Sequence, residues 1–452
     1  MTVSISLLGG VGEFGRNCML IDDEGFGAAI VVDCGLMLEA SPATEADEAP
    51  RTALYPSFAP LEARRDVLCG YVITHGHDDH IGGLPVAMEM ATAPVYATRF
   101  TRERVRQRFR RARLEAPEFM GVDTGGSRKV GPFLVEWIAV SHSIPDAAAV
   151  LIHTSEGALL HSGDFRVDLD PRLGFPTDLT ALERAGDEGV ALLMADSTGA
   201  PVDGDNPGEK SVTQPLEDAF CRTRGRFIVA TFSPQIQRVQ LLLDLAAAHG
   251  RRVFPLGRGM RDALTLARKQ NLLQDHGVLR PEGELHAVPP SRACVIATGS
   301  QGERGAALWK LAYDEHPRLG LVPGDTVVLS ARTIPGNELD VTAVVERLEA
   351  RGIQVLDGQE GRHVSGHGFA GDLETLLRRA RPQHFLPVHG EERHLAAHRE
   401  IARRCGLAED AIVHARNGHR LVVAKGRVHV EAWRDRTAQS DIDVGVASSR
   451  AT

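Results

Sequence analysis

The sequence predicts an α/β protein that combines two architectures. In the first 200 residues, short apolar runs such as 4–8, 18–21 and 28–33 are separated by glycine turns, which is typical of hairpins in a mostly antiparallel sheet. Beyond residue 215, strand-like and helix-like segments alternate, which is typical of a parallel sheet flanked by helices. The chain has 452 residues, so two or three folding units are expected.

The remaining elements follow in chain order. Residues 38–60, rich in Ala, Pro, Glu and Asp, are expected to form an exposed loop, and 81–92 a helix. Further strands are expected at 133–140, 149–153, 158–161 and 190–194. The alternating part has strands at 226–231, 252–256, 293–298 and 326–330 and helices at 235–248, 261–273, 303–313 and 339–350. The last third adds helices at 372–380 and 391–405, a strand at 384–388 and a terminal hairpin, with fraying expected from Ala438.

Composition and charge restrict the function classes. Apolar residues make up 43% and charged residues 25%, as in soluble globular proteins. No apolar run is long enough to span a membrane, and the start has neither a basic leader nor a cleavage-site pattern, so we expect a cytoplasmic protein without a membrane partner. The six cysteines lack a C-x-x-C pair and are expected to be reduced, buried thiols. Because the formal net charge is −9, a nucleic acid would need local positive patches and metal ions.

A cluster of ligand-type side chains follows the apolar run at 67–73. His75, His77, Asp79 and His80 form an H-x-H-x-D-H pattern. The first two imidazoles can converge on one metal, while the aspartate and the third histidine reach a second. The alternative is a polar loop that is rich in histidine by chance. Four ligand-type residues in this order favour a two-metal hydrolytic site.

A two-metal site needs ligands from elsewhere in the chain. His142, Asp164 and His389 each follow a strand-like run. A carboxylate is the usual bridge, because its two oxygens can each bind one metal, and this makes Asp164 the natural bridging candidate.

An arginine-rich segment follows the metal-type cluster. Eight arginines lie between Arg99 and Arg113. A helix of this composition could bind a phosphate backbone, or it could be a solvated face with Glu103 and Glu115 as partial partners. Both interpretations stay open at this point.

The order of these motifs carries a family resemblance. The ligand series resembles that of the metallo-β-lactamase fold, an αββα sandwich with metals at the sheet edges, and the segment between Asp164 and His389 resembles an inserted α/β β-CASP domain. From about Ser4 to Val423 the chain resembles the bacterial ribonuclease J family. The motifs that carry this resemblance are LGGVGE (8–13), SIPD (143–146), DST (196–198), TGSQGE (298–303), IPGNE (334–338), HVSGH (363–367) and PVHGE (387–391).

The resemblance implies roles for individual residues. It implies one zinc held by His75, His77 and His142, a second held by Asp79, His80 and His389, and Asp164 as the bridge. Asp33 would orient the cluster from behind the ligands. Asp79, Asp196 and His367 would be catalytic, and Ser233, Ser365, Gly366 and His367 would contact phosphate. Two cations supply a nucleophilic water at neutral pH and neutralise phosphate charge, and a histidine can protonate the leaving oxygen.

The implied function is hydrolysis of single-stranded RNA. The expected enzyme is a 5′-to-3′ exonuclease, an endonuclease or both, leaves a 5′-phosphate, and uses two Zn²⁺ per chain, with Mn²⁺ or Mg²⁺ as alternatives. The expected divisions are a metallo-β-lactamase domain at 1–200 and 351–425, a β-CASP domain at 201–350, and a tail at 426–452. Because too few residues follow Val423 for the family's C-terminal domain, a homodimer or a monomer is expected rather than a tetramer.

The chain departs from the family pattern where RNA would lie. Gly199 follows the DST motif in place of Asn, residues 232–235 read Phe-Ser-Pro-Gln, and Arg304-Gly305 follow the TGSQGE motif. These changes concern nucleotide contacts and end preference and leave the metal-type set intact. Two alternatives stay open beside the ribonuclease: a DNA-processing β-CASP nuclease, and a non-catalytic RNA-binding scaffold of the same fold. A small-molecule hydrolase is disfavoured, because the large insertion would then have no evident purpose.

Overall fold

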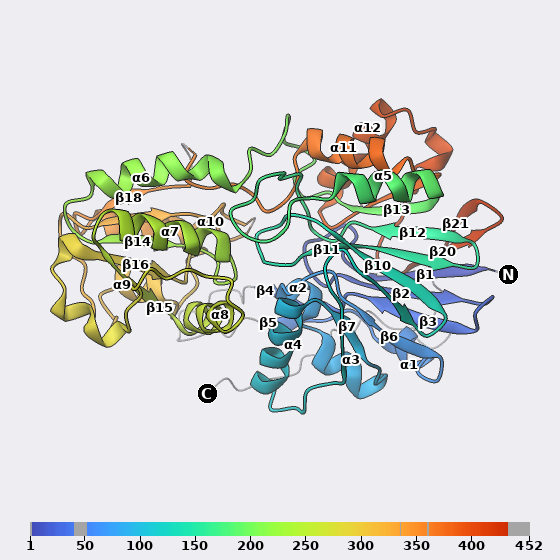
Figure 1. Ribbon diagram of the computed structural model, residues 1–452, viewed down its shortest axis with the longest axis horizontal. Coiled ribbons are helices and arrows are strands. Elements are labelled where there is room, and N and C mark those ends of the chain that lie inside the picture. Colours follow the sequence, from blue (N-terminus) through green and yellow to red (C-terminus); the bar gives the residue numbers. More distant parts are fainter. Residues whose placement is uncertain (1, 40–51, 335, 359–360, 433–452) are drawn as a thin grey trace.

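Two packed sheets form one lobe of the molecule, and a third sheet forms the other (Figure 1). The computed structural model describes residues 2–39, 52–334, 336–358 and 361–432. Most of the loop expected at 38–60 lies outside these ranges, and the described part of it contains a two-stranded sheet of β4 (Met37–Glu39) and β5 (Thr52–Leu54) and the short helix α1 (Ala59–Glu62).

The first large sheet has eight strands in the order β21-β20-β1-β2-β3-β6-β7-β8. Their bounds are β1 Val3–Gly9, β2 Cys18–Asp23, β3 Ala28–Val32, β6 Leu68–Val72, β7 Val95–Ala97, β8 Phe119–Gly121, β20 His419–Ala424 and β21 Arg427–Ala432. Strands β1 to β3 pair antiparallel, as their glycine turns predict, whereas β3, β6, β7 and β8 pair parallel. The parallel half places the loop after β6 at the same end of the sheet as the loop after β3.

The second sheet has six strands in the order β19-β13-β12-β11-β10-β9. Their bounds are β9 Ser127–Val130, β10 Phe133–Ala139, β11 Ala148–Thr154, β12 Gly157–His161, β13 Val190–Asp196 and β19 His384–Val388. Strands β12, β13 and β19 are parallel neighbours, and β10 runs in the same direction because two antiparallel pairings separate it from β12. The carboxyl ends of these four strands therefore meet at one edge.

The two sheets pack face to face and are covered by helices on their outer faces. Buried side chains of both sheets, such as Ile5, Val32, Trp137 and Leu192, form one core between them. Outside the first sheet lie α1, α2 (Asp78–Ile81), α3 (Leu84–Met90) and α4 (Arg99–Arg111), and outside the second lie α5 (Leu179–Glu188), α11 (Ala370–Ala380) and α12 (Glu392–Arg404) (Figure 1). The predicted αββα sandwich is confirmed.

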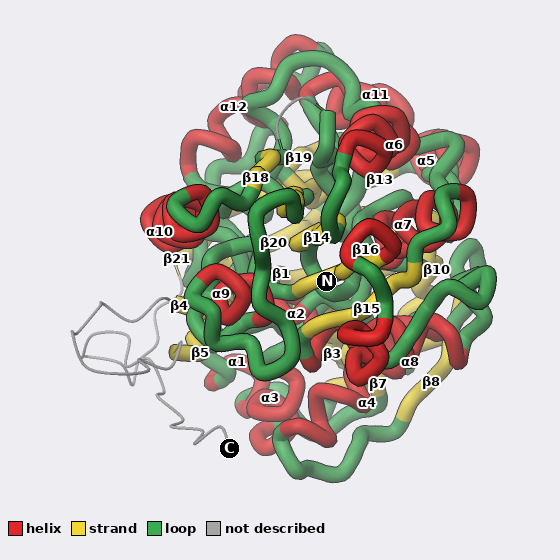
Figure 2. Tube along the Cα trace, turned by 90° about the vertical axis from the view of Figure 1, so that its left-hand side faces the viewer, coloured by secondary structure: helices red, strands yellow, loops and turns green. Residues whose placement is uncertain are grey.

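The other lobe is a parallel sheet with helices on both faces, as the alternating pattern predicts. Its strand order is β15-β16-β14-β17-β18, with bounds β14 Phe227–Ala230, β15 Arg252–Leu256, β16 Ala293–Ala297, β17 Thr326–Leu329 and β18 Gln354–Leu356. One face carries α6 (Thr213–Arg222), α7 (Ile236–Ala248) and α8 (Arg258–Lys269), and the other carries α9 (Ala307–Ala312) and α10 (Glu338–Glu349), as Figure 2 shows. Four short 3₁₀ helices complete the described elements at Glu209–Val212, Glu282–Ala287, Pro290–Arg292 and Glu409–Ala411.

Several details differ from the sequence-based expectations. Strand β18 pairs with β17, so the third sheet continues past the expected boundary at residue 350. The expected tail at 426–452 begins with β21, which pairs with β20 at the edge of the first sheet. The helix expected at 81–92 is α3, which begins at Leu84 after Gly82 and Gly83, while Ile81 is the last residue of α2. The helix expected at 303–313 is α9, which begins only after Gly305, whose φ of 74° is incompatible with a right-handed helix. Cys221 is exposed and does not fit the prediction of buried thiols.

Candidate metal centre

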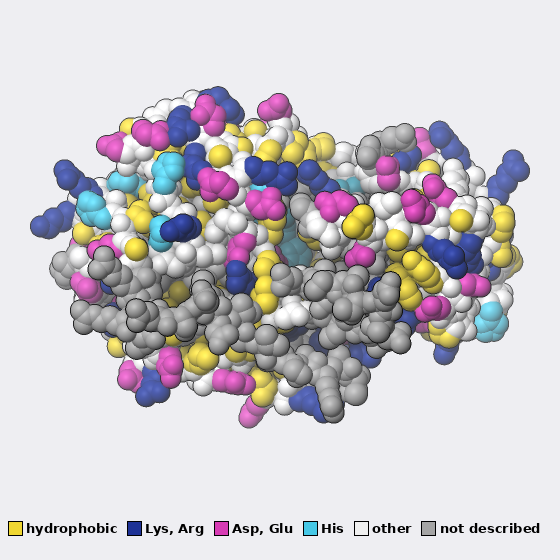
Figure 3. All heavy atoms as spheres, turned by 180° about the vertical axis from the view of Figure 1, so that it is seen from behind, with side chains coloured by type: hydrophobic (Ala, Val, Ile, Leu, Met, Phe, Trp, Pro, Cys, Tyr) yellow, Lys and Arg dark blue, Asp and Glu magenta, His cyan; other side chains and the backbone are white. Residues whose placement is uncertain are grey.

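The expected ligands lie at strand ends that meet at one edge of the sandwich. His75, His77, Asp79 and His80 follow β6, and the last two lie in α2. His142 follows β10, Asp164 follows β12 and His389 follows β19. Parallel strand directions explain why residues more than 200 positions apart meet here. In Figure 3 a hollow lies between the two lobes, with histidine side chains at its floor.

One group of donor atoms comprises His75, His77, His142 and Asp164. His75 Nε2 lies 3.0 Å from His77 Nδ1, and His142 Nε2 lies 3.2 Å from the same atom. Asp164 Oδ2 lies 3.6 Å from His75 Nε2 and 3.8 Å from His142 Nε2. In a tetrahedral zinc site with bonds of about 2.0–2.1 Å, neighbouring ligand atoms lie about 3.3 Å apart. The four residues therefore fit a single zinc ion.

A second group comprises Asp79, His80, His389 and again Asp164. His80 Nε2 lies 3.3 Å from Asp164 Oδ1 and 3.6 Å from Asp79 Oδ2. His389 Nε2 lies 3.5 Å from Asp79 Oδ2, while its Nδ1 lies 2.7 Å from Asp164 Oδ1. Asp164 thus directs Oδ2 to the first group and Oδ1 to the second, which is the arrangement that a bridging carboxylate requires.

Buried groups behind the candidate ligands hold their imidazoles by hydrogen bonds. Asp33, which has a left-handed φ of 55°, lies 2.7 Å from His80 Nδ1 through Oδ2. Both of its oxygens also accept hydrogen bonds from Thr74, from the backbone N–H and from the hydroxyl, each at 2.8 Å. Thr74 Oγ1 in turn lies 3.1 Å from His75 Nδ1. Asp33 therefore lies directly behind the His80 imidazole and, through Thr74, behind that of His75.

Burial and neighbouring charges divide the histidines into two classes. Burial lowers the pKa of His75, His77 and His142, that of His77 to about 4, so these imidazoles are neutral at pH 7 and have a lone pair available for a metal. Burial opposes protonation of His389 too, but Asp164 outweighs it and raises the pKa of His389 to about 10.

The carboxylates show the complementary shift. Burial alone would raise the pKa of Asp164, yet His389 and His80 hold it well below its ordinary value. Asp164 is therefore ionised at neutral pH. Without a cation its charge is balanced by protons on neighbouring imidazoles, and a metal would replace these protons.

His367 and Asp196 form a hydrogen-bonded pair beside both groups. His367 Nδ1 lies 2.7 Å from Asp196 Oδ2, and the His367 ring packs against those of His142 and His389 with centroids 5.0 and 5.5 Å apart. Burial opposes protonation, but Asp196 outweighs it and raises the pKa of His367. Asp196 thus keeps a proton on Nδ1 and stabilises the imidazolium form.

The loop that carries Ser365, Gly366 and His367 packs directly on the first ligand group. Gly366 O lies 2.8 Å from His142 Nδ1, and a Cβ built on Gly366 would come within 2.8 Å of His142 Cε1. The HVSGH motif (363–367) is thereby joined to the first group through its backbone. Ser365 Oγ accepts a hydrogen bond from the His367 N–H at 3.0 Å, which fixes the turn between them.

Ser233 lies apart from this cluster in the loop between β14 and α7. A Cβ built on Gly259, near the start of α8, would lie 2.8 Å from Ser233 Oγ. Within the described residues, no hydrogen bond or ion pair joins Ser233 to the ligand-type side chains. Its expected phosphate contact stays a prediction.

Three further residues contact the centre and were missed in the sequence. Asn17 Nδ2 lies 3.0 Å from His80 Nε2, and Asn206 Nδ2 donates hydrogen bonds to Ser365 O at 3.0 Å and His367 O at 2.8 Å. Buried Arg166 donates to Ser365 O at 2.9 Å. Asn17 follows the LGGVGE motif and Asn206 precedes a Pro-Gly pair, but neither lies within a ligand pattern.

The arginine-rich segment forms α4, and its inner side supports the metal-type loop. Buried Arg104 donates a hydrogen bond from Nε to Gly76 O at 3.2 Å and lies 3.6 Å from Asp78. Arg106 pairs with Glu103, which confirms one of the partial partners expected for a solvated face. No helix among the described residues is long and apolar enough to span a membrane.

Sequence models of three domain families match the chain. "Ribonuclease J, beta-CASP domain" matches residues 224–348, "Zn-dependent metallo-hydrolase RNA specificity domain" matches 359–413, and "Beta-lactamase superfamily domain" matches 29–188.

Curated relatives match over most of the chain. Ribonuclease J of Mycolicibacterium smegmatis is 38% identical over 94% of this chain and 75% of its own length. Ribonuclease J of Corynebacterium glutamicum is 35% identical over 99% of this chain and 62% of its own length, and that of Helicobacter pylori is 34% identical over 93% and 60%. A crystal structure of a protein of unknown function from Enterococcus faecalis has a TM-score of 0.63 at 15% identity, covers 93% of this chain and all of that one, and supports the fold alone.

Proposed function

Because this chain belongs to the ribonuclease J family, we propose that it hydrolyses single-stranded RNA at two divalent cations and leaves a 5′-phosphate. That it is a metal-dependent ribonuclease follows from the family and from its RNA-specificity and metallo-hydrolase domains. The relatives are named as ribonucleases, which disfavours the DNA-processing and scaffold alternatives. Both 5′-to-3′ exonucleolytic and endonucleolytic cleavage belong to the proposal, as does action in the cytoplasm.

The division of Asp164 between two donor groups carries the two-metal proposal. Oδ2 faces His75 and His142, and Oδ1 faces His80. We assign His75, His77 and His142 to one ion, Asp79, His80 and His389 to the other, and Asp164 to both. Zinc suits the mixed imidazole and carboxylate donors, with Mn²⁺ or Mg²⁺ as alternatives. Bound here, the cations would supply a nucleophilic water and neutralise phosphate charge.

His367 is the proposed proton donor. Its Nδ1 is held by Asp196, so the second proton of the imidazolium form would be carried on Nε2, and Asp196 favours this form by raising the pKa of His367. An imidazolium in this position can protonate the leaving oxygen of the scissile phosphodiester. Ser365 and Gly366 belong to the same loop and would contact the phosphate, with Ser233 as a further contact from the other lobe. A homodimer stays a prediction.

The first test compares substrates. Purified zinc-loaded protein is incubated with end-labelled 5′-monophosphate RNA and with DNA of matched sequence, with and without a chelator. We expect chelator-sensitive cleavage of RNA and 5′-phosphate products. Equal activity on DNA, or RNA cleavage that persists in the chelator, would overturn the proposal. Product mapping distinguishes stepwise release from the 5′ end from internal cuts.

The second test separates catalysis from metal binding. His367→Ala is expected to retain both metals and lose about 10²–10⁴-fold in turnover, the usual contribution of a general acid. His414→Ala, which removes a side chain 56% exposed to solvent, is the matched control and should behave as the wild type. Loss of a metal in the His367 variant would show that this residue is a ligand.

A further inference from the structure

The outer surface of α4 and α8 is strongly basic in a protein of net charge −9. Helix α4 contains seven arginines and one glutamate, and α8 contains three arginines, one lysine and one aspartate. Each helix buries an apolar stripe, which includes Phe100 and Val105 in α4 and Leu264 in α8. Apart from buried Arg104, the basic residues are therefore concentrated on the remaining faces of these two helices.

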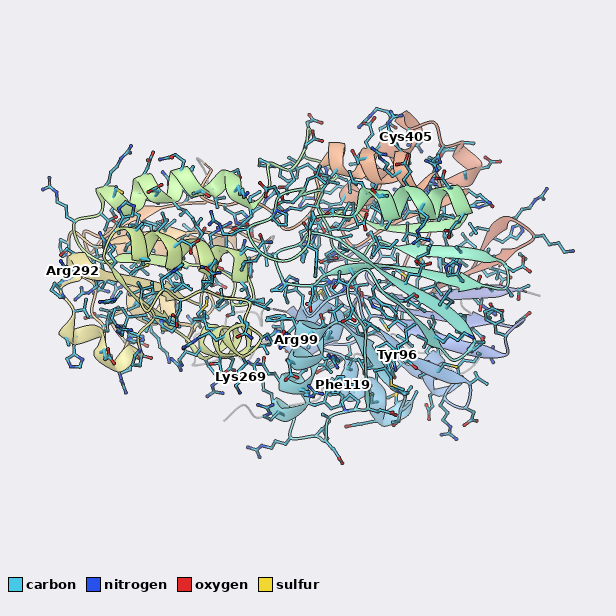
Figure 4. All side chains as sticks on the ribbon, viewed as in Figure 1. Tyr96, Arg99, Phe119, Lys269, Arg292 and Cys405 are labelled. Atoms are coloured by element: carbon cyan, nitrogen blue, oxygen red, sulfur yellow. The ribbon has the colours of Figure 1, made fainter. Side chains whose placement is uncertain are left out.

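The two helices lie side by side across the seam between the lobes. Arg99 Nη1 donates to Gln270 O at 3.5 Å, and Gln270 Nε2 donates to Arg99 O at 3.2 Å. At the other end of α4, Arg111 pairs with Asp262 at 2.8 Å. These contacts join the start of α4 to the end of α8 and the end of α4 to the first turns of α8, so the helices run antiparallel. Figure 4 shows Arg99 and Lys269 on the two sides of this seam.

Several cations on this surface have no partner in the protein. Both acids of the two helices are already engaged, Glu103 by Arg106 and Asp262 by Arg111. Within the part of the chain that the structure describes, the exposed side chains of Arg110, Arg113 and Lys269 form no hydrogen bond or ion pair. Arg110 and Arg113 mark one end of the seam, and Lys269 marks the other.

The same helix connects this surface to the metal centre. Arg104 on the inner side of α4 holds Gly76 O, between His75 and His77. A helix with side chains is about 10–12 Å across, and α4 is about 20 Å long. A nucleic-acid strand bound along its outer side would therefore extend over several nucleotides, at a distance of about one helix diameter from the metal-type loop. Such a strand would have to be longer than the few nucleotides that fill the centre itself.

We propose that the α4–α8 seam is a second binding surface for the phosphate backbone of single-stranded RNA, outside the metal centre. This inference rests on the proposed ribonuclease function for the identity of the polyanion. Guanidinium groups bind phosphate oxygens in pairs, and unpaired exposed arginines lose little solvation in doing so. The surface anchors long RNA to both lobes and contributes nothing to a very short substrate.

The test uses a triple variant, Arg110→Gln, Arg113→Gln and Lys269→Gln, in the zinc-loaded full chain. Its matched control is Arg292→Gln, Arg404→Gln and Arg427→Gln, which removes the same charge from exposed positions on other surfaces; Figure 4 labels Arg292 at the far end of the second lobe. Fluorescence anisotropy measures the affinity for a phosphorothioate-linked RNA of about 30 nucleotides at several salt concentrations, since each phosphate contact to a single strand adds about 0.7 to the slope of log K against log salt. KM is measured for normal RNA of that length and for a tetranucleotide.

The loss of three phosphate contacts should lower the magnitude of the slope of log K against log salt by about 2 in the seam variant. The slope of the control variant should equal that of the wild type. KM should rise for the long RNA alone, with the tetranucleotide cleaved at the wild-type rate. An unchanged slope, or equal losses in both triple variants, would overturn the proposal. A wild-type protein that cleaves neither RNA would instead refute the ribonuclease function, while the binding data would still decide whether the seam binds RNA.

Discussion

Gly366→Ala should weaken the first metal site by steric contact alone. The added Cβ would lie 2.8 Å from His142 Cε1 and 3.0 Å from His142 Nδ1, whereas non-bonded carbon atoms prefer about 3.5–4.0 Å. His142 would therefore have to move by roughly 0.7 Å or more, while metal–ligand distances tolerate about 0.2 Å. The His142 hydrogen bond to Gly366 O would be distorted by the same movement.

The expected cost is about 10–100-fold in affinity for one of two zinc ions, the range seen when groups that orient metal ligands are altered, or roughly 1.4–2.8 kcal/mol. Competition with a chromophoric chelator measures both affinities, and turnover on RNA should fall in parallel with zinc occupancy. Gly320→Ala is the control, because its Cβ would meet only the exposed Asp314 side chain, at 3.3 Å. Two ions bound to the Gly366 variant with wild-type affinity would refute the reasoning.

Three further predictions concern single polar residues. Asp164→Asn should lower the affinity for both metal ions, since one carboxylate belongs to both donor groups. Competition with a chelator measures the two affinities, and a fall in only one of them would contradict bridging. Asn206→Ala should leave the part-buried His367 carbonyl unpaired and Ser365 O with Arg166 as its remaining donor, destabilise the fold by about 1–3 kcal/mol in urea denaturation and reduce turnover at unchanged zinc content. Asp146 accepts from Phe100 N at 2.8 Å, and burial raises its pKa from 3.8 to about 7. Folding therefore favours the protonated form of Asp146. The free energy of unfolding, relative to that of Asp146→Asn, should fall by up to about 4 kcal/mol as pH rises from about 4 to 7. Urea denaturation of both proteins at pH 4 and pH 8 measures this, and the same difference between them at both pH values would contradict the prediction.

The local sequence was sufficient to predict the part of the candidate metal site whose residues are close together in the chain. His75, His77, Asp79 and His80 lie within six residues, so the turn after one strand brings their donors together. The alternation of strands and helices beyond residue 215 predicted the parallel sheet for the same reason, because each βα unit is encoded in a continuous segment. The fold class followed from these patterns.

Pairing of distant segments was decided by the tertiary structure alone. No sequence pattern predicts that Asn206 donates hydrogen bonds to the carbonyls of Ser365 and His367, because an asparagine before Pro-Gly is typical of an ordinary turn. The arginine-rich helix shows the same limit. Its composition could not predict which arginine contacts Gly76 and which stays in solvent, because the orientation of the helix depends on its packing against α2 and α8. These surfaces meet only in the folded chain.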